Sequence, residues 1–382
     1  MYDKFESLTK DDIIKELKRL REELVVTKTY GEKNTCLESI ITYNQLLSSL
    51  TGDDVSVNIN RILKKQKNSI LLSGDKEAKL YDNFSNNFIS NKEFFKELTS
   101  NLLKTLEDSI LEFDNKDYDL YLYPEEDIIT LIINFFYEYY PNKLDLVEDM
   151  LKKKRVIGVD NLTDYSGVCF HIYKNLPIVL FQRDRNLTLK EFATITHELG
   201  HVIDFEDLDS RYSSNFSQKY FYNSTFLELN SLLVETQSLD FLSKNKLNEL
   251  FVREIQYNNL ISTYTNLIGI NLFTELDNDL IKNGSVLFCD SDFVKGITNL
   301  DLVYDDNNFS FNLKDNLMYG LSGVMASYFN SLISEYKELG QKMYNDFWAY
   351  RCDLFRPQLF DELNINQDDI GKRLVKQIKK IN

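Results

Sequence analysis

Residues that interrupt helices are scarce in this sequence of 382 residues, which contains only 4 Pro and 13 Gly. Leu, Lys, Glu and Ile are abundant by contrast, and this combination favours long helices over a many-stranded sheet. Hydrophobic residues make up 43% of the chain, which is enough to bury a sizeable core. The sequence therefore predicts a mainly helical, globular protein and excludes the collagen-like and disordered classes.

Paired cysteines and long apolar runs are missing as well. The four cysteines form no Cys-x-x-Cys pair, which argues against a cysteine zinc site; they are Cys36, Cys169, Cys289 and Cys352. No run approaches the roughly 18 apolar residues that span a membrane, and the charged start of the chain lacks the apolar core of a signal peptide. We therefore expect a soluble, cytoplasmic protein with reduced thiols and no membrane partner.

Positive charge is in the minority, because 44 Lys and Arg stand against 60 Asp and Glu and the net charge is −16. A field of this sign repels a phosphate backbone, so we expect no nucleic-acid partner. The one basic cluster, at residues 372–380, is typical of a last helical turn, where cations interact favourably with the helix dipole.

The order of elements along the chain suggests two regions. Before Pro124 there is no proline, and apolar residues recur at helical spacing, as at Phe94, Leu98 and Leu102. A polar segment at 114–117 predicts a boundary between an N-terminal helical region, 1–118, and a second region, 119–382. The second region contains the one convincing strand pair, at 167–172 and 177–181, and is otherwise mostly helical.

The strongest motif is His197-Glu198-x-x-His201. Thr188 and Glu191 form a capping box that predicts a helix start just before it, and an apolar stripe then recurs every three or four residues. The spacing of the two histidines places both imidazoles on one side of this helix, one turn apart. They can bind one Zn²⁺, and Glu198 can take a proton from water at the metal.

Zinc in such a site needs a third protein ligand, and no His follows His201 in the sequence. A carboxylate on the next apolar helix, residues 226–240, is therefore expected. Glu228 is the first candidate, and Glu235 is the alternative ligand or supports one. The competing interpretation of Glu228 is a capping box with Thr225. Asp204 and Glu206 follow His201 too closely, and we expect them at the solvated end of the helix.

Two motifs resemble those of the oligopeptidase F and thimet oligopeptidase family of zinc peptidases: HELGH at 197–201 and FLELNSLLVE at 226–235. In that family they read HExGH and F-x-E-x-x-S-x-x-x-E, and the first Glu of the second motif is a zinc ligand, which matches Glu228. The segment at 165–182 is similar to the family's Gly-x-Cys stretch and the strand after it. The segment at 319–329 is similar to its Tyr-rich cleft helix, and the resemblance covers roughly residues 121–382.

The resemblance implies roles for further residues. Gly167 and His171 would lie in an edge strand that binds substrate, although the same residues fit an ordinary strand entry and a packed or solvated histidine. Some members carry a His ahead of the cleft tyrosines, which this chain lacks. Tyr319 is then the first candidate, and Tyr328 the second, for stabilising the oxyanion or lining the cleft. For both tyrosines the alternative is a packed helix aromatic.

These observations together predict a helical zincin-type metallopeptidase with a small β element bordering a zinc-lined cleft. One Zn²⁺ per chain would be held by His197, His201 and Glu228, with Glu198 as general base. The resemblance implies short peptides as substrates and a channel that excludes folded proteins, although the N-terminal region is much shorter than in the family. A zinc exopeptidase and a catalytically silent zincin that binds peptides are the competing interpretations.

Overall fold

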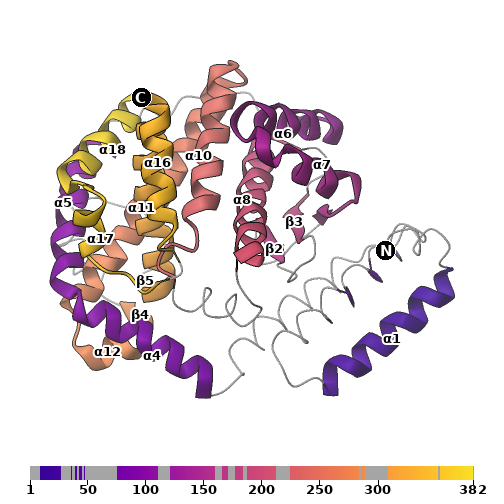
Figure 1. Cartoon of the computed structure of the whole chain (residues 1–382), viewed down its shortest axis with the longest axis horizontal. Coiled ribbons are helices and arrows are strands. Elements are labelled where there is room, and N and C mark those ends of the chain that lie inside the picture. Colours follow the sequence, from indigo (N-terminus) through magenta and orange to yellow (C-terminus); the bar gives the residue numbers. More distant parts are fainter. Residues whose placement is uncertain are drawn as a thin grey trace. The chain divides into compact units, whose positions relative to one another are not determined.

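A computed structural model of the chain describes residues 9–26, 36, 39–40, 43–44, 47, 75–110, 121–159, 166–170, 177–183, 187–211, 224–283, 285–288, 309–351 and 353–381. Helices predominate in this part of the chain, and the strands are few and short, which confirms the predicted fold class. The chain divides into two compact units (Figure 1). Unit 1 contains Met1–Glu77 and Leu122–Ser214, and unit 2 contains Ala78–Tyr121 and Asn215–Asn382. The division predicted from sequence, 1–118 and 119–382, is a different one and stays a prediction.

Unit 1 combines helices with a three-stranded sheet. The helices are α1 (Lys10–Val26), α6 (Glu125–Tyr139), the short η2 (Pro141–Lys143), α7 (Leu144–Lys152) and α8 (Leu189–Arg211). The strands are β1 (Val156–Val159), β2 (Gly167–Phe170) and β3 (Ile178–Gln182), in the order β1-β3-β2. The antiparallel pair β2 and β3 confirms the predicted strand pair, whose residues 171–172 lie outside the described part. The parallel strand β1 was not predicted.

The sheet is held together by its central strand. Residues Ile178–Phe181 of β3 are buried on both faces, as expected of a strand between two others. Helix α8 lies against β2 and β3 (Figure 1). Helix α6 also packs against α8, where the rings of Phe135 and Phe192 lie 6.4 Å apart edge to face. The position of α8 is therefore set by the apolar core of unit 1.

Unit 2 is a bundle of helices with a small hairpin. The helices are α4 (Asp75–Ser90, which begins in unit 1), α5 (Lys92–Ile110), α10 (Leu229–Lys244), α11 (Glu249–Glu275), α12 (Asn278–Asn283), α14 (Leu313–Asn316), η3 (Leu317–Leu321), α15 (Ser322–Glu335), α16 (Lys337–Trp348), α17 (Gln358–Glu362) and α18 (Gln367–Ile381). Strands β4 (Ser285–Phe288) and β5 (Phe309–Asn312) pair antiparallel. This hairpin was also not predicted from the sequence.

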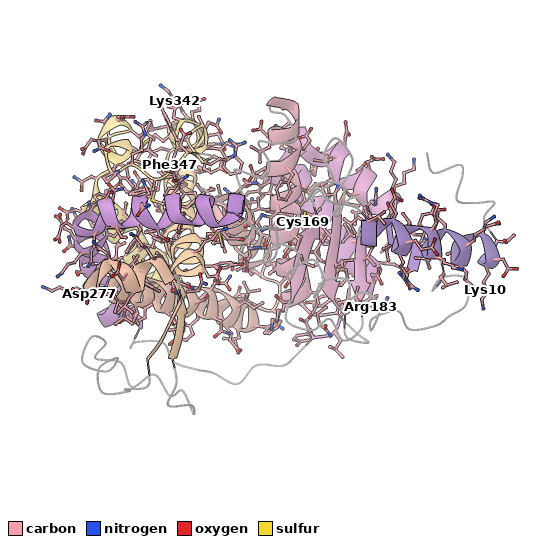
Figure 2. The ribbon with its side chains drawn as sticks, turned by 90° about the horizontal axis from the view of Figure 1, so that it is seen from below. Lys10, Cys169, Arg183, Asp277, Lys342 and Phe347 are labelled. Carbon is pink, nitrogen blue, oxygen red and sulfur yellow. The ribbon has the colours of Figure 1, made fainter. Side chains whose placement is uncertain are left out.

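The core of unit 2 is rich in aromatic side chains contributed by distant segments. Phe226, Phe329 and Phe347 meet at centroid distances of 4.8 and 5.4 Å, and Phe347 is labelled in Figure 2. Helix α5 packs against α11 and α18, so a segment near the start of this unit contacts its last helix. None of the helices described is both long and apolar enough to cross a membrane.

Candidate metal centre

Helix α8 begins as its sequence predicts. The Glu191 carboxylate accepts hydrogen bonds from the backbone N–H of Thr188 at 2.5 Å and from the Thr188 hydroxyl at 2.6 Å. The Thr188 oxygen in turn accepts from the backbone N–H of Lys190 at 3.1 Å. These bonds satisfy N–H groups that have no partner within the helix, and they fix its first turn.

The apolar stripe of α8 is the face that it buries. Leu189, Phe192, Ile195, Leu199 and Val202 are all at most 2% exposed. This burial fixes the rotation of the helix about its axis, because the same five positions cannot face the core in any other orientation.

The two histidines lie outside that stripe. His197 and His201 are half-buried, and their ring centroids are 5.1 Å apart with an interplanar angle of 79°. The ring of His201 also stacks on Phe205, with centroids 6.2 Å apart. Two imidazoles one turn apart on a fixed helix present nitrogen donors to a common point.

Glu198 is held between α8 and strand β2. Its side chain is only 6% exposed. A Cβ atom at Gly167 would lie 2.8 Å from Glu198 Oε1 and 2.6 Å from Thr194 Cγ2, so no side chain fits between the strand and the helix. The β2 backbone thus lies directly on the carboxylate, in a sheet where β2 is an end strand. Cys169, labelled in Figure 2, marks this strand.

Glu228 directly precedes α10 in unit 2, where it occupies the N-cap position without a capping bond from its side chain. It is 6% exposed, and its Oε2 accepts a hydrogen bond from the fully buried Ser231 at 2.9 Å. Phe226, two residues earlier, anchors the segment against Phe347 in the core. The capping box with Thr225 is not formed, because the helix begins only after Glu228.

The donor atoms of His197, His201 and Glu228 all lie within 4.8 Å of one another, so these three side chains could hold a metal ion. Two imidazole nitrogens and one carboxylate oxygen are a donor set that suits Zn²⁺ and leaves a fourth position open. Glu235 is not part of this group in the described chain; its carboxylate accepts from the Asn259 side chain at 2.7 Å. Its role in supporting a ligand stays a prediction.

The remaining predicted residues fall into three groups. Tyr319 is 39% exposed, whereas Tyr328 is 2% exposed and packs against Phe329, with the Arg373 guanidinium over its ring. This burial favours the packing alternative for Tyr328, and its substrate role stays a prediction. His171 lies outside the described residues. The expected solvated position of Asp204 is wrong, because α8 continues to Arg211 and Asp204 is only 1% exposed.

Similar structures include two crystal structures from bacteria. One is described as a peptidase from Chlamydophila abortus, with a TM-score of 0.49 and 13% identity over 96% of this chain and 63% of that one. Another is described as an oligoendopeptidase F from Bacillus anthracis str. Ames, with a TM-score of 0.45 and 12% identity over 92% of this chain and 67% of that one.

A third similar structure is PZ peptidase A with an inhibitor, at a TM-score of 0.47 and 12% identity over 95% of this chain and 71% of that one. The chain thus spans about two thirds of the length of these structures. No family model matches the chain, and no curated protein matches it by sequence.

Proposed function

We propose that this chain is a zinc metallopeptidase that hydrolyses peptide bonds in short peptides. The observation that carries the proposal is the grouping of His197, His201 and Glu228 donor atoms around one point, with Glu198 next to His197 on the same helix. Chance surface clusters of carboxylates are common, but these side chains are buried or half-buried and Glu228 is oriented by Ser231. A buried carboxylate of this kind needs a cationic or hydrogen-bonding partner.

The three ligand residues would hold one Zn²⁺ and leave it an open coordination position. When bound, the metal would lower the pKa of a water in that position toward about 7 and so supply a nucleophile at neutral pH. Glu198 would accept the proton that this water loses and later pass it to the leaving amine. The 6% exposure of Glu198 keeps bulk water from competing for that carboxylate.

Strand β2 would orient the peptide substrate. It is an end strand of its sheet, and Gly167 brings its backbone into contact with Glu198. A peptide that pairs with this strand would have its backbone fixed by main-chain hydrogen bonds, with little dependence on its side chains. Tyr319 would donate a hydrogen bond to the carbonyl oxygen as that oxygen becomes negative. His171 stays a candidate for contact with substrate.

The direct test is the zinc content of the purified chain together with its cleavage of a mixed library of short peptides. We expect about one zinc per chain, cleavage that a chelator abolishes, and a Glu198→Gln variant that keeps zinc but loses turnover. His201→Ala should lose both. The cut positions separate an endopeptidase from an exopeptidase that needs a free terminus. Stoichiometric zinc with no cleavage of any peptide would instead support a silent zincin, and absence of zinc would refute the proposal.

A further inference from the structure

Tyr319 lies in a π turn that joins two α-helical segments without a gap. Helix α14 ends at Asn316, η3 (Leu317–Leu321) is π-helical, and α15 continues to Glu335. In a π turn the backbone hydrogen bonds span five residues and not four, so one extra residue is accommodated in the turn. Such turns are rare and often occur at functional sites. Tyr319 lies at the middle of this one.

Tyr319 is also the one exposed residue between Asn316 and Ala326. From Asn316 to Ala326 every other residue is buried, while Tyr319 is 39% exposed. An ordinary amphipathic helix would expose about half of its positions over three turns. The turn therefore presents a single phenol from a segment that is otherwise inside the core.

Helix α11 holds the start of this turn through a notch, which is the space left beside Gly269 by its missing side chain. A Cβ atom at Gly269 would lie 2.5 Å from both Cγ and Nδ2 of Asn316, so the Asn316 side chain occupies the space that a larger residue would fill. Asn316 Nδ2 donates a hydrogen bond to Asn266 Oδ1 at 3.0 Å. The Asn316 side chain is thus held by two residues one turn apart on α11.

The second contact with α11 comes directly after Tyr319. A Cβ atom at Gly320 would lie 3.0 Å from Ile270 Cδ1 and 3.2 Å from Asn266 Cβ. The chain therefore packs closely against α11 on both sides of Tyr319, through Asn316 before it and Gly320 after it.

The Asn316 contact is not optimal for stability. Its Oδ1 is buried and has no hydrogen-bond partner in the described part of the chain. An unpaired buried acceptor disfavours folding, and such atoms in native proteins call for an explanation. A role in holding the turn supplies one.

We infer that Asn316 is a positioning residue: seated in the Gly269 notch, it sets the π turn that presents Tyr319 to the substrate. The inference rests on the proposed function for the use made of Tyr319. If the turn relaxed to a regular α-helix, the side chains before and after it would rotate relative to one another by about 100°. Tyr319 would then turn toward the core.

Two variants disturb the notch from opposite sides. Asn316→Ala removes the seated side chain, and Gly269→Ala fills its place. Each should lower kcat about tenfold or more with KM nearly unchanged, because a group that acts only as the oxyanion forms is misplaced. Tyr319→Phe should lower kcat about 100-fold. Neither notch variant should cause a further loss when combined with Tyr319→Phe.

Gly323→Ala is the matched control. A Cβ atom there would lie 2.5 Å from the Thr263 hydroxyl of the same helix α11, but beyond the π turn. It should reduce the melting temperature about as much as Gly269→Ala does, yet leave kcat and its dependence on Tyr319 unchanged. Loss of kcat in all three variants in proportion to their melting temperatures would refute a specific role for Asn316.

A readout without turnover separates this inference from the proposed function. Nitration of Tyr319 by tetranitromethane, quantified by peptide mass mapping, reports how accessible its ring is. We expect nitration to be several-fold slower in Asn316→Ala and Gly269→Ala than in the unmodified chain and Gly323→Ala. Unchanged nitration, or kcat losses that add fully to that of Tyr319→Phe, would overturn the inference. A chain that binds no zinc and cleaves nothing would refute the proposed function, and nitration would still decide the role of Asn316.

Discussion

Replacement of Gly167 by alanine tests the contact between strand β2 and the proposed general base. The added Cβ would lie 2.6 Å from Thr194 Cγ2, 2.8 Å from Glu198 Oε1 and 3.0 Å from Glu198 Cγ. Ordinary contacts at such an atom begin at 3.4 Å. The strand and α8 must therefore separate by about 0.8 Å to relieve the contact with Thr194, and the contact with Glu198 Oε1 requires a shift of about 0.6 Å.

The size of the loss in stability and in rate depends on which of these atoms can move. Thr194 is β-branched and restricted at χ1, so its methyl group has few other positions. Glu198 has more freedom, so its carboxylate is expected to be displaced in addition to the separation of β2 from Thr194. Overpacking of this kind costs about 1–3 kcal/mol of stability. A displacement approaching 1 Å at a reacting group costs on the order of 100-fold in rate.

We therefore expect Gly167→Ala to lower kcat/KM about 100-fold while zinc content stays near that of the unmodified chain. Neither His197 nor His201 is among the atoms that the new Cβ approaches most closely. The measurements are peptide cleavage, bound zinc and thermal unfolding on the same preparation.

Gly158→Ala is the matched control in the same sheet. A Cβ there would lie 2.7 Å from Arg183 Cδ and 2.9 Å from Arg183 Cβ, away from Glu198. Arg183 is labelled in Figure 2, directly after β3. This variant should lose stability but keep its turnover. If Gly167→Ala kept turnover within about twofold of the unmodified chain despite a real loss of stability, β2 would not constrain Glu198. Equal losses of turnover in both variants would indicate a general disturbance of the sheet.

Two further predictions concern unit 2. Ser231→Ala should weaken zinc binding about 10- to 100-fold, because Ser231 orients the Glu228 carboxylate. Ser238→Ala removes an equally buried hydroxyl, which donates to the backbone carbonyl of Glu235, and it should leave zinc binding unchanged. Chelator competition measures both affinities, and equal losses in the two variants would contradict the role of Ser231. Burial lowers the pKa of Lys314 from 10.5 to about 8, so between these values the unfolded chain binds more protons and stability rises with pH. Lys314→Met should therefore raise the melting temperature near pH 7, and the gain should shrink toward about pH 10; a gain independent of pH would contradict this account.

The parts of the structure that were predicted correctly depend on neighbours in sequence. The start of α8 follows from Thr188 and Glu191, which are three residues apart, and its buried face follows from a stripe repeated every turn. The pairing of β2 with β3 depends on a short connection. Each of these signals is contained within one segment, so periodicity and capping chemistry reveal it.

The missed features depend on distant partners. Strand β1 has only four residues, which are mostly half-buried and show no alternation, and it forms by parallel pairing with β3 across a long connection. Asp204 lies three residues after His201, but its burial depends on α8 continuing as far as Arg211. The π turn at Tyr319 requires the notch at Gly269, which is 50 residues away from Tyr319 in sequence. No local pattern encodes such contacts.

The alternation of the chain between its two units has a consequence for biosynthesis. Unit 1 ends at Ser214, so α8 can pack against α6, β2 and β3 while the rest of the chain is still being made. Unit 2 begins within α4, at Ala78, and its helix α5 packs against α18, which is made much later. During synthesis α5 can pack against α11 first, but its contact with α18 must wait until α18 has been made. A chain that stops before α18 would leave the part of α5 that contacts α18 uncovered, and it should be prone to aggregation and chaperone capture.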